Sequence, residues 1–204
     1  MKEKWNIALP AVMMVVFALS RWPGLMPENF SAVYGLVFCA AVYFPGKLAW
    51  YLPLGTLLVT DVFMNLFHYH ADLVSGYMLV NYLAYGSILW LGRQFSARSS
   101  WLSLLSGGLL GAILFYLVTN TAAWMQNPQY AKTLAGWIQA LTIGTPGWPH
   151  TWEFFRNTLL SGGLFTGLFA GAMKLSEAAE ESEEEEEGET AAEPREPKAE
   201  EAEA

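Results

Sequence analysis

The sequence predicts an all-α membrane protein, a polytopic bundle of about six transmembrane helices followed by an acidic tail. Of its 204 residues, 53% are hydrophobic, and they gather into runs long enough to cross a bilayer. The runs are unbroken, unlike the alternating segments of about ten residues in a membrane β-barrel. Charge is also divided unevenly, since residues 1–175 carry a formal +4 and residues 176–204 a formal −12.

The number of helices follows from the apolar runs. A helix needs about 20 apolar residues to span the hydrocarbon core. Pro10 removes a backbone donor and predicts a kink in the first run. A weaker apolar stretch over 130–148 predicts a short helix that lies at the surface or dips inward. The six candidate spans are 5–20, 30–46, 49–69, 75–93, 101–125 and 151–174.

The first run has a second interpretation, a cleaved signal peptide. Lys2 and Lys4 precede it, and Ala18-Leu19-Ser20 imitates a cleavage site. Five further apolar runs favour an uncleaved first helix.

Basic residues predict that both termini face the cytoplasm (N-in/C-in), because cytoplasmic loops are enriched in Lys and Arg. With the N-terminus inside, six basic residues fall on inner segments and three on outer ones. The predicted location is therefore the bacterial inner membrane. The inner residues are Lys2, Lys4, Lys47, Arg93, Arg98 and Lys174, and the outer ones are Arg21, Lys132 and Arg156.

Composition divides the chain into a transmembrane domain, 1–175, and a tail, 176–204. The tail has no aromatic or strongly apolar residue. It cannot bury enough surface to offset the entropy of ordering, so we expect a disordered acidic cytoplasmic segment. Its role is that of a solvated solubility tail or, alternatively, a docking tail for a basic partner.

Polar residues form stripes along the predicted helices. In "GTLLVTDVFMNLFHYH" (55–70), Asp61, Asn65 and His68 lie within about 60° of one another on a helical wheel. A charged side chain at mid-membrane costs roughly 2.5–3.5 kcal/mol on insertion scales, so such residues face the bundle interior or a cavity. The candidate solute-binding residues are Asp61, Asn65, His68, Asn81, Asn120, Trp124, Glu153, Arg156 and Asn157.

These candidate residues fall in the outer half of the predicted bundle or near its midplane, whereas the inner half carries spaced glycines. Small residues at such spacing let helices approach closely. We therefore expect a bundle that is tight inside and opens outward as a solute-binding cup. The glycines of the inner half are Gly107 and Gly111 on one helix and Gly163, Gly167 and Gly171 on another.

The two charged residues well inside the predicted spans, Asp61 and Arg156, are expected to face the same cavity. Two interpretations stay open: a ligand site accessible to water, or a buried structural ion pair. Asn81 and Asn120 could equally be hydrogen-bonded glue between helices.

Catalytic, metal and cofactor sites are not indicated. His68 and His70 point about 200° apart on a helix, which argues against a metal site with Asp72 and His150. An intramembrane enzyme using Asp61 and His68 is an alternative without a catalytic signature. The absence of a Walker-type loop means that any ATP-driven step belongs to a partner. We expect no cofactor and no nucleic-acid partner.

The stretches "RWPGLMPENFSAVYGLVFCAAVYF", "LPLGTLLVTDVFMNLF" and "LVTNTAAWMQNPQYAKTLAGWIQALTIGTPGWPHTWEFFRNTLLSGGLFTGLFAG" resemble an uncharacterised family of small bacterial integral membrane proteins. The resemblance covers most of residues 20–172. The predicted architecture is also similar to the substrate-binding S components of energy-coupling factor (ECF) vitamin transporters. The Ala-x-x-x-Ala pattern of their first helix is absent here, where Ala8 and Ala11 are three apart.

That second likeness implies a protein that binds a vitamin or similar micronutrient from outside the cell. It also implies a transmembrane coupling subunit with ATPases as partner, in addition to the lipid bilayer. The alternative is a structural or accessory membrane subunit without a ligand.

Overall fold

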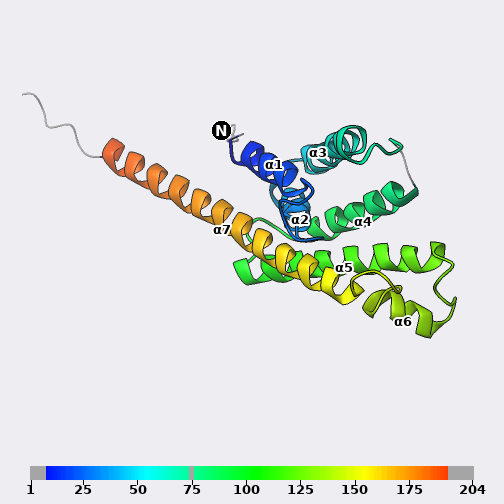
Figure 1. The fold of residues 1–204 in the computed structure, drawn as a ribbon. Coiled ribbons are helices and arrows are strands. Elements are labelled where there is room, and N and C mark those ends of the chain that lie inside the picture. Colours follow the sequence, from blue (N-terminus) through cyan, green and yellow to red (C-terminus); the bar gives the residue numbers. More distant parts are fainter. Residues whose placement is uncertain (1–7, 74–75, 193–204) are drawn as a thin grey trace, which may run out of the picture. The chain divides into compact units, whose positions relative to one another are not determined.

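A computed structural model describes residues 8–73 and 76–192 of the chain, and all regular structure within them is helical (Figure 1). The chain divides into two units, residues 1–170 and 171–204. In chain order the helices are α1 (Ala8–Ser20), α2 (Val33–Tyr43), α3 (Leu48–Met64), the π-helix η1 (Asn65–Tyr69), α4 (Gly76–Gly92), α5 (Trp101–Gln126), α6 (Leu134–Thr142) and α7 (Thr151–Ala192).

The predicted all-α class is confirmed, and helices occupy the apolar runs from which it was inferred. Three helices are long and apolar enough to cross a membrane: Leu48–Tyr69, Trp101–Gln126 and Thr151–Ala179. By contrast, α2 has 11 residues and rises only about 16 Å, roughly half of a 30 Å hydrocarbon core. The count of six spans therefore stays a prediction.

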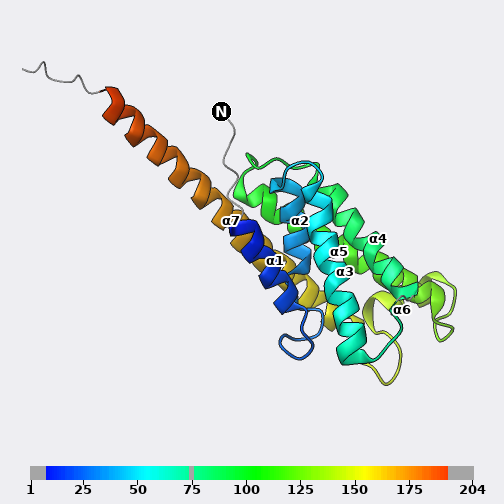
Figure 2. The same ribbon diagram turned by 90° about the horizontal axis from the view of Figure 1, so that it is seen from above.

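Helix α2 forms the centre of the first unit. Its residues 33–41 are all buried, and it contacts α1, α3, α4 and α5 (Figure 2). A short helix that is apolar on every face has no solvent-facing stripe, and this pattern is typical of a core helix. Phe38 at its middle is fully buried and meets Phe95 edge-on, with ring centroids 5.2 Å apart.

Glycines bring the other helices against α2. A Cβ added at Gly92 would lie 2.6 Å from Ala41 Cβ, and one at Gly107 would collide with the Phe38 ring. The tight helix contact predicted for Gly107 is thus confirmed. A Cβ at Gly167 would lie 3.4 Å from the Trp101 ring, an ordinary contact, so Gly167 is not a site of close helix approach.

The closest approach involves residues that the sequence pattern did not single out. A Cβ at Gly35 would lie 2.5 Å from the Thr166 amide nitrogen, and one at Gly108 would overlap the Thr166 side chain. Helices α2, α5 and α7 therefore meet at Thr166, which is fully buried.

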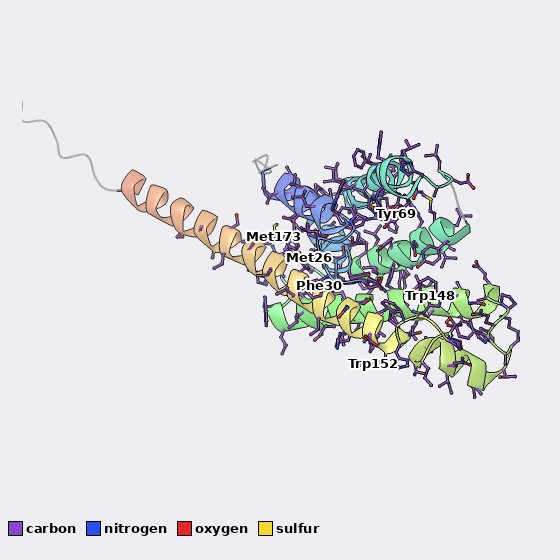
Figure 3. All side chains as sticks on the ribbon, in the orientation of Figure 1. Met26, Phe30, Tyr69, Trp148, Trp152 and Met173 are labelled. Atoms are coloured by element: carbon purple, nitrogen blue, oxygen red, sulfur yellow. The ribbon has the colours of Figure 1, made fainter. Side chains whose placement is uncertain are left out.

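The stretch 130–148 contains the short helix α6, as predicted. The Thr133 side chain caps its N-terminus by accepting from the Gly136 amide, 3.2 Å away. The Trp137 indole nitrogen donates to Thr121 of α5 (3.0 Å). Trp148, just before α7, and Trp152, in its first turn, are 75% and 48% exposed (Figure 3).

Tyr116 of α5 joins these elements. Its hydroxyl donates to the Leu141 carbonyl oxygen at 2.6 Å and lies 3.2 Å from the Thr151 carbonyl oxygen.

We expect Tyr116→Phe to lower the free energy of unfolding by about 1–2 kcal/mol, because it leaves buried carbonyl groups without their donor. Thermal unfolding in detergent measures this. Tyr51→Phe is the matched control, since Tyr51 is 67% exposed, and an equal loss in both variants would contradict the proposed role of Tyr116.

The acidic segment differs from its predicted state. Disorder was expected from Ser176, but α7 continues to Ala192. Glu and Ala are strong helix formers, and extending an existing helix avoids the cost of nucleation. The remainder of the predicted tail, residues 193–204, lies outside the described residues, as do Lys2 and Lys4.

Candidate functional site

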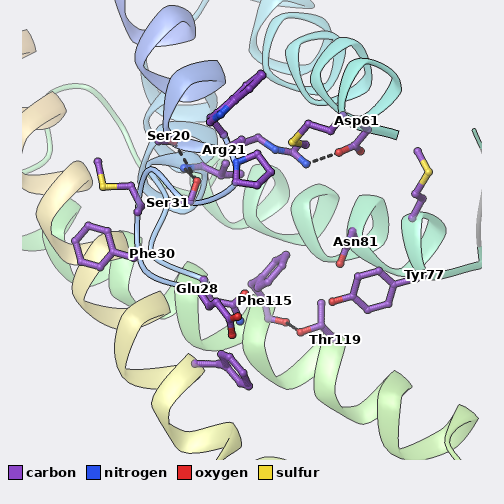
Figure 4. Close-up of a pocket in the computed structure, with 18 of the residues that line it drawn as sticks. Ser20, Arg21, Glu28, Phe30, Ser31, Asp61, Tyr77, Asn81, Phe115 and Thr119 are labelled. Carbon is purple, nitrogen blue, oxygen red and sulfur yellow. Dashed lines mark hydrogen bonds and ion pairs between the residues drawn. The ribbon is translucent and has the colours of Figure 1, made fainter. Parts of the chain in front are cut away.

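The first unit contains a cavity of about 990 Å³ (Figure 4). It is bounded by the start of α2, the end of α3, η1, the start of α4, the second half of α5 and Phe154 of α7. The segment 20–31 between α1 and α2 forms a further wall. The glycine contacts at Gly92 and Gly107 lie toward the opposite ends of the same helices. A volume near 1,000 Å³ is at the upper end of the usual range for small-molecule sites.

Ser20, the last residue of α1, holds the two ends of segment 20–31 together. The Ser20 hydroxyl donates to the Phe17 carbonyl oxygen (3.0 Å) and accepts from the Ala32 amide (3.0 Å). It also lies 3.1 Å from the Ser31 hydroxyl oxygen. These bonds tie the end of α1 to the beginning of α2, so that the intervening residues project as a loop.

This loop places Arg21 in the cavity wall. The Arg21 guanidinium donates to the Asp61 carboxylate, and the two side chains are only 16% and 13% exposed. Asp61 and Arg156 do not face the same cavity, because Arg156 is not among the lining residues. The ion pair of Asp61 is formed with Arg21 instead. A helical wheel gives the direction of a side chain on its own helix but does not include partners supplied by a loop.

Three predicted asparagines line the cavity: Asn65, Asn81 and Asn120. The Asn65 amide donates to the Asp72 carbonyl oxygen (3.3 Å), and the Asn120 amide donates to the Tyr116 carbonyl oxygen (2.9 Å). Their polar stripes therefore do converge, as the sequence predicted, from α4, α5 and the α3–η1 junction.

Two buried polar atoms of the cavity wall lack a hydrogen-bond partner in the described structure. They are Nη1 of Arg21 and Oδ1 of Asn81. A buried polar atom left unpaired costs about 1–3 kcal/mol, and such atoms are rare in native proteins. Nη1 of Arg21 is a donor and Oδ1 of Asn81 is an acceptor.

Aromatic side chains line the same cavity between α2, α4 and α5. The Phe115 ring centroid lies 4.9 Å from that of Tyr34 and 4.8 Å from that of Tyr85. All three are at least 90% buried. Close to them, Tyr77 and Asn81 of α4 face Phe115 and Thr119 of α5 across the opening (Figure 4).

The remaining predicted residues do not line the cavity. His68 contacts Trp22, with ring centroids 6.3 Å apart. It belongs to the π-helix η1, whose i→i+5 bonding differs from the α-helical spacing on which the sequence argument rests. Asp61 lines the cavity and His68 does not.

The other four predicted residues lie on α5 or in the first two turns of α7. The Trp124 indole nitrogen donates to the Ala131 carbonyl oxygen (2.9 Å). Glu153 occupies the first turn of α7, where a carboxylate suits the helix dipole. The Arg156 guanidinium lies 5.4 Å from the centroid of the Trp152 ring. The Asn157 amide donates to the Glu28 carbonyl oxygen (2.9 Å), which anchors loop 20–31.

Sequence reasoning missed Arg21, Ser20 and Ser31 as parts of the site. A usable signal was present, since Arg21 directly follows an apolar helix. The metal alternative finds no support in the described residues, where no three His, Cys, Asp or Glu side chains come together as ligands.

Comparison with known proteins yields one family. A family model described as "Family of unknown function (DUF6580)" matches residues 1–184. No curated protein and no solved structure matches the chain.

Proposed function

The chain belongs to this family of unknown function, and we propose that it binds a small vitamin- or micronutrient-like solute in its cavity as the substrate-binding subunit of a transporter. The observation that carries the proposal is the cavity of about 990 Å³ between helices that elsewhere pack through glycine contacts. Convergent polar groups set among aromatic side chains are typical of small-molecule sites.

The polar wall supports solute binding more than a packing role. Nη1 of Arg21 and Oδ1 of Asn81 are buried without partners. Most buried polar groups of native proteins have a hydrogen-bond partner. A solute in the cavity would supply the bonds that these two atoms lack.

The proposed setting is the bacterial inner membrane, with six spans and both termini in the cytoplasm. Lys and Arg bias favours this orientation, in which the cavity end faces outward. The sequence contains no Walker-type phosphate loop, so a coupling subunit with ATPases would supply the energy for transport.

A structural or accessory subunit is the second candidate. The Arg21–Asp61 pair supports it, because this pair neutralises both charges without a ligand. The intramembrane enzyme is less well supported, since Asp61 is engaged by Arg21 and His68 does not line the cavity.

Thermal unfolding of the full-length protein in detergent, with a panel of neutral, anionic and cationic vitamins and nucleobases, tests the proposal. A solute that binds only the folded state at 100 times its Kd adds about 2.7 kcal/mol of stability, so we expect at least one member to raise the Tm. Ala123→Trp, on the cavity wall, should abolish the shift.

The matched control is Ala122→Trp, one residue along α5 and outside the residues that line the cavity. Each variant is compared with its own ligand-free Tm. If no solute stabilises the protein, the structural-subunit interpretation replaces this one.

A further inference from the structure

We propose that the cavity selects a neutral, planar heterocycle that carries both a carbonyl acceptor and an N–H donor, as lactam rings do. This inference rests on the proposed function and names the chemical class of its solute. It follows from the charges of the cavity wall, from its two unpartnered polar atoms and from its aromatic lining.

The charge of the wall disfavours an anion. Among the described residues that line the cavity, three carry carboxylates and one carries a guanidinium: Glu28, Asp61 and Asp72, and Arg21. The guanidinium is already paired with Asp61. An anionic solute would meet an excess of negative charge with no free cation to neutralise it, and like charges disfavour binding.

The unpartnered atoms disfavour a solute that is only a cation or only a donor. Nη1 of Arg21 needs an acceptor, and Oδ1 of Asn81 needs a donor. A cation that brings donors alone would leave Nη1 of Arg21 without an acceptor. A lactam carries the complement of each atom, because its carbonyl oxygen accepts and its ring N–H donates.

The aromatic lining favours a flat ring over an aliphatic amide. Tyr34, Tyr85 and Phe115 are buried with their ring centroids 4.8–6.5 Å apart. Such rings prefer offset-stacked or edge-on contacts with further aromatic groups. The volume of about 990 Å³ exceeds a single small ring, so a bicyclic system or a ring with a side chain fits the space better.

Binding of lumazine and hypoxanthine tests the inference in mildly acidic buffer, where both bicyclic lactams are uncharged. We expect at least one to raise the Tm of the full-length protein. The probe 1,3-dimethyllumazine keeps both carbonyl groups but has lost its ring N–H donors, so it should bind at least about tenfold more weakly than lumazine, in keeping with the loss of a hydrogen bond in a buried site. Lumazine-6-carboxylate, an anion, should also bind more weakly.

Asn81→Leu removes the acceptor and should weaken lactam binding by on the order of tenfold. Gln94→Met is the matched control just beyond the end of α4, where Gln94 is exposed and donates to the Trp90 carbonyl oxygen, and it should bind as the wild type does. Unchanged lactam binding by Asn81→Leu would overturn the inference.

The wider solute panel separates this inference from the proposed function. If an anionic or cationic solute binds more tightly than any neutral lactam, and Ala123→Trp abolishes that binding, the solute class is wrong and the proposed function stands. If no solute of any class stabilises the protein, both are wrong.

Discussion

Gly35→Ala is expected to lower the free energy of unfolding by about 3 kcal/mol. The added Cβ would lie 2.5 Å from the Thr166 amide nitrogen and 2.9 Å from the Phe165 carbonyl carbon. Both are backbone atoms of α7, so no side-chain rotation relieves the overlap and the two helices must separate. Overpacking a dense core costs roughly 1–3 kcal/mol, occasionally more, and the upper part of that range applies to a clash with backbone.

Gly86→Ala is the control for this variant. Gly86 also lies inside a helix, but a Cβ added there would have nothing within 4 Å. Alanine is the better helix former by about 1 kcal/mol, so the substitution should leave stability unchanged or raise it. Thermal unfolding of both variants in the same detergent checks the pair. Equal stability of the two would show that α2 and α7 are not in close contact at Gly35.

The sequence was sufficient for the all-α class and the positions of the helices, because these depend on local information. An unbroken apolar run followed by Gly, Pro or charged residues indicates a helix whatever it packs against. The position of the polar side chains toward one end of their helices was also local information, and three predicted asparagines do line one cavity.

Pairing between segments could not be predicted in this way. Asp61 binds Arg21, forty residues away, through a loop whose course depends on the Ser20 bonds. The π-helix at 65–69 could not be predicted either, because periodicity arguments assume 100° per residue. Gly35 and Gly108 owe their importance to Thr166 on a third helix, and no spacing within one helix reveals that contact.

In the acidic segment, the sequence argument was wrong about local conformation rather than about contacts between segments. Composition indicated that 176–192 cannot form a core, and this argument concerns tertiary burial alone. Helix formation needs no core when the residues are good helix formers and continue a helix already formed. The low apolar content indicates that the segment does not pack into a core, but it does not determine the local backbone conformation.

Asp61→Asn is expected to destabilise the protein by about 2–3 kcal/mol, because it leaves the Arg21 charge in the wall without its carboxylate. Removing one member of a fully buried pair costs roughly 3–5 kcal/mol, and the 13–16% exposure of these side chains lets water recover part of that loss. Asp72→Asn is the control: Asp72 lines the same cavity but is exposed, and its change should have little effect on the Tm.

The double variant Arg21→Gln/Asp61→Asn distinguishes a charge effect from a general loss of packing. With neither charge present, no uncompensated ion remains, so most of the stability lost in Asp61→Asn should return. Solute binding should not return with it, because Nη1 of Arg21 is one of the two cavity atoms proposed to meet the ligand. Denaturation curves and solute-induced Tm shifts of the wild type, Asp61→Asn, Asp72→Asn and the double variant measure both stability and binding. Recovery of stability and of binding together would make the pair a purely structural element and would remove Arg21 from the site.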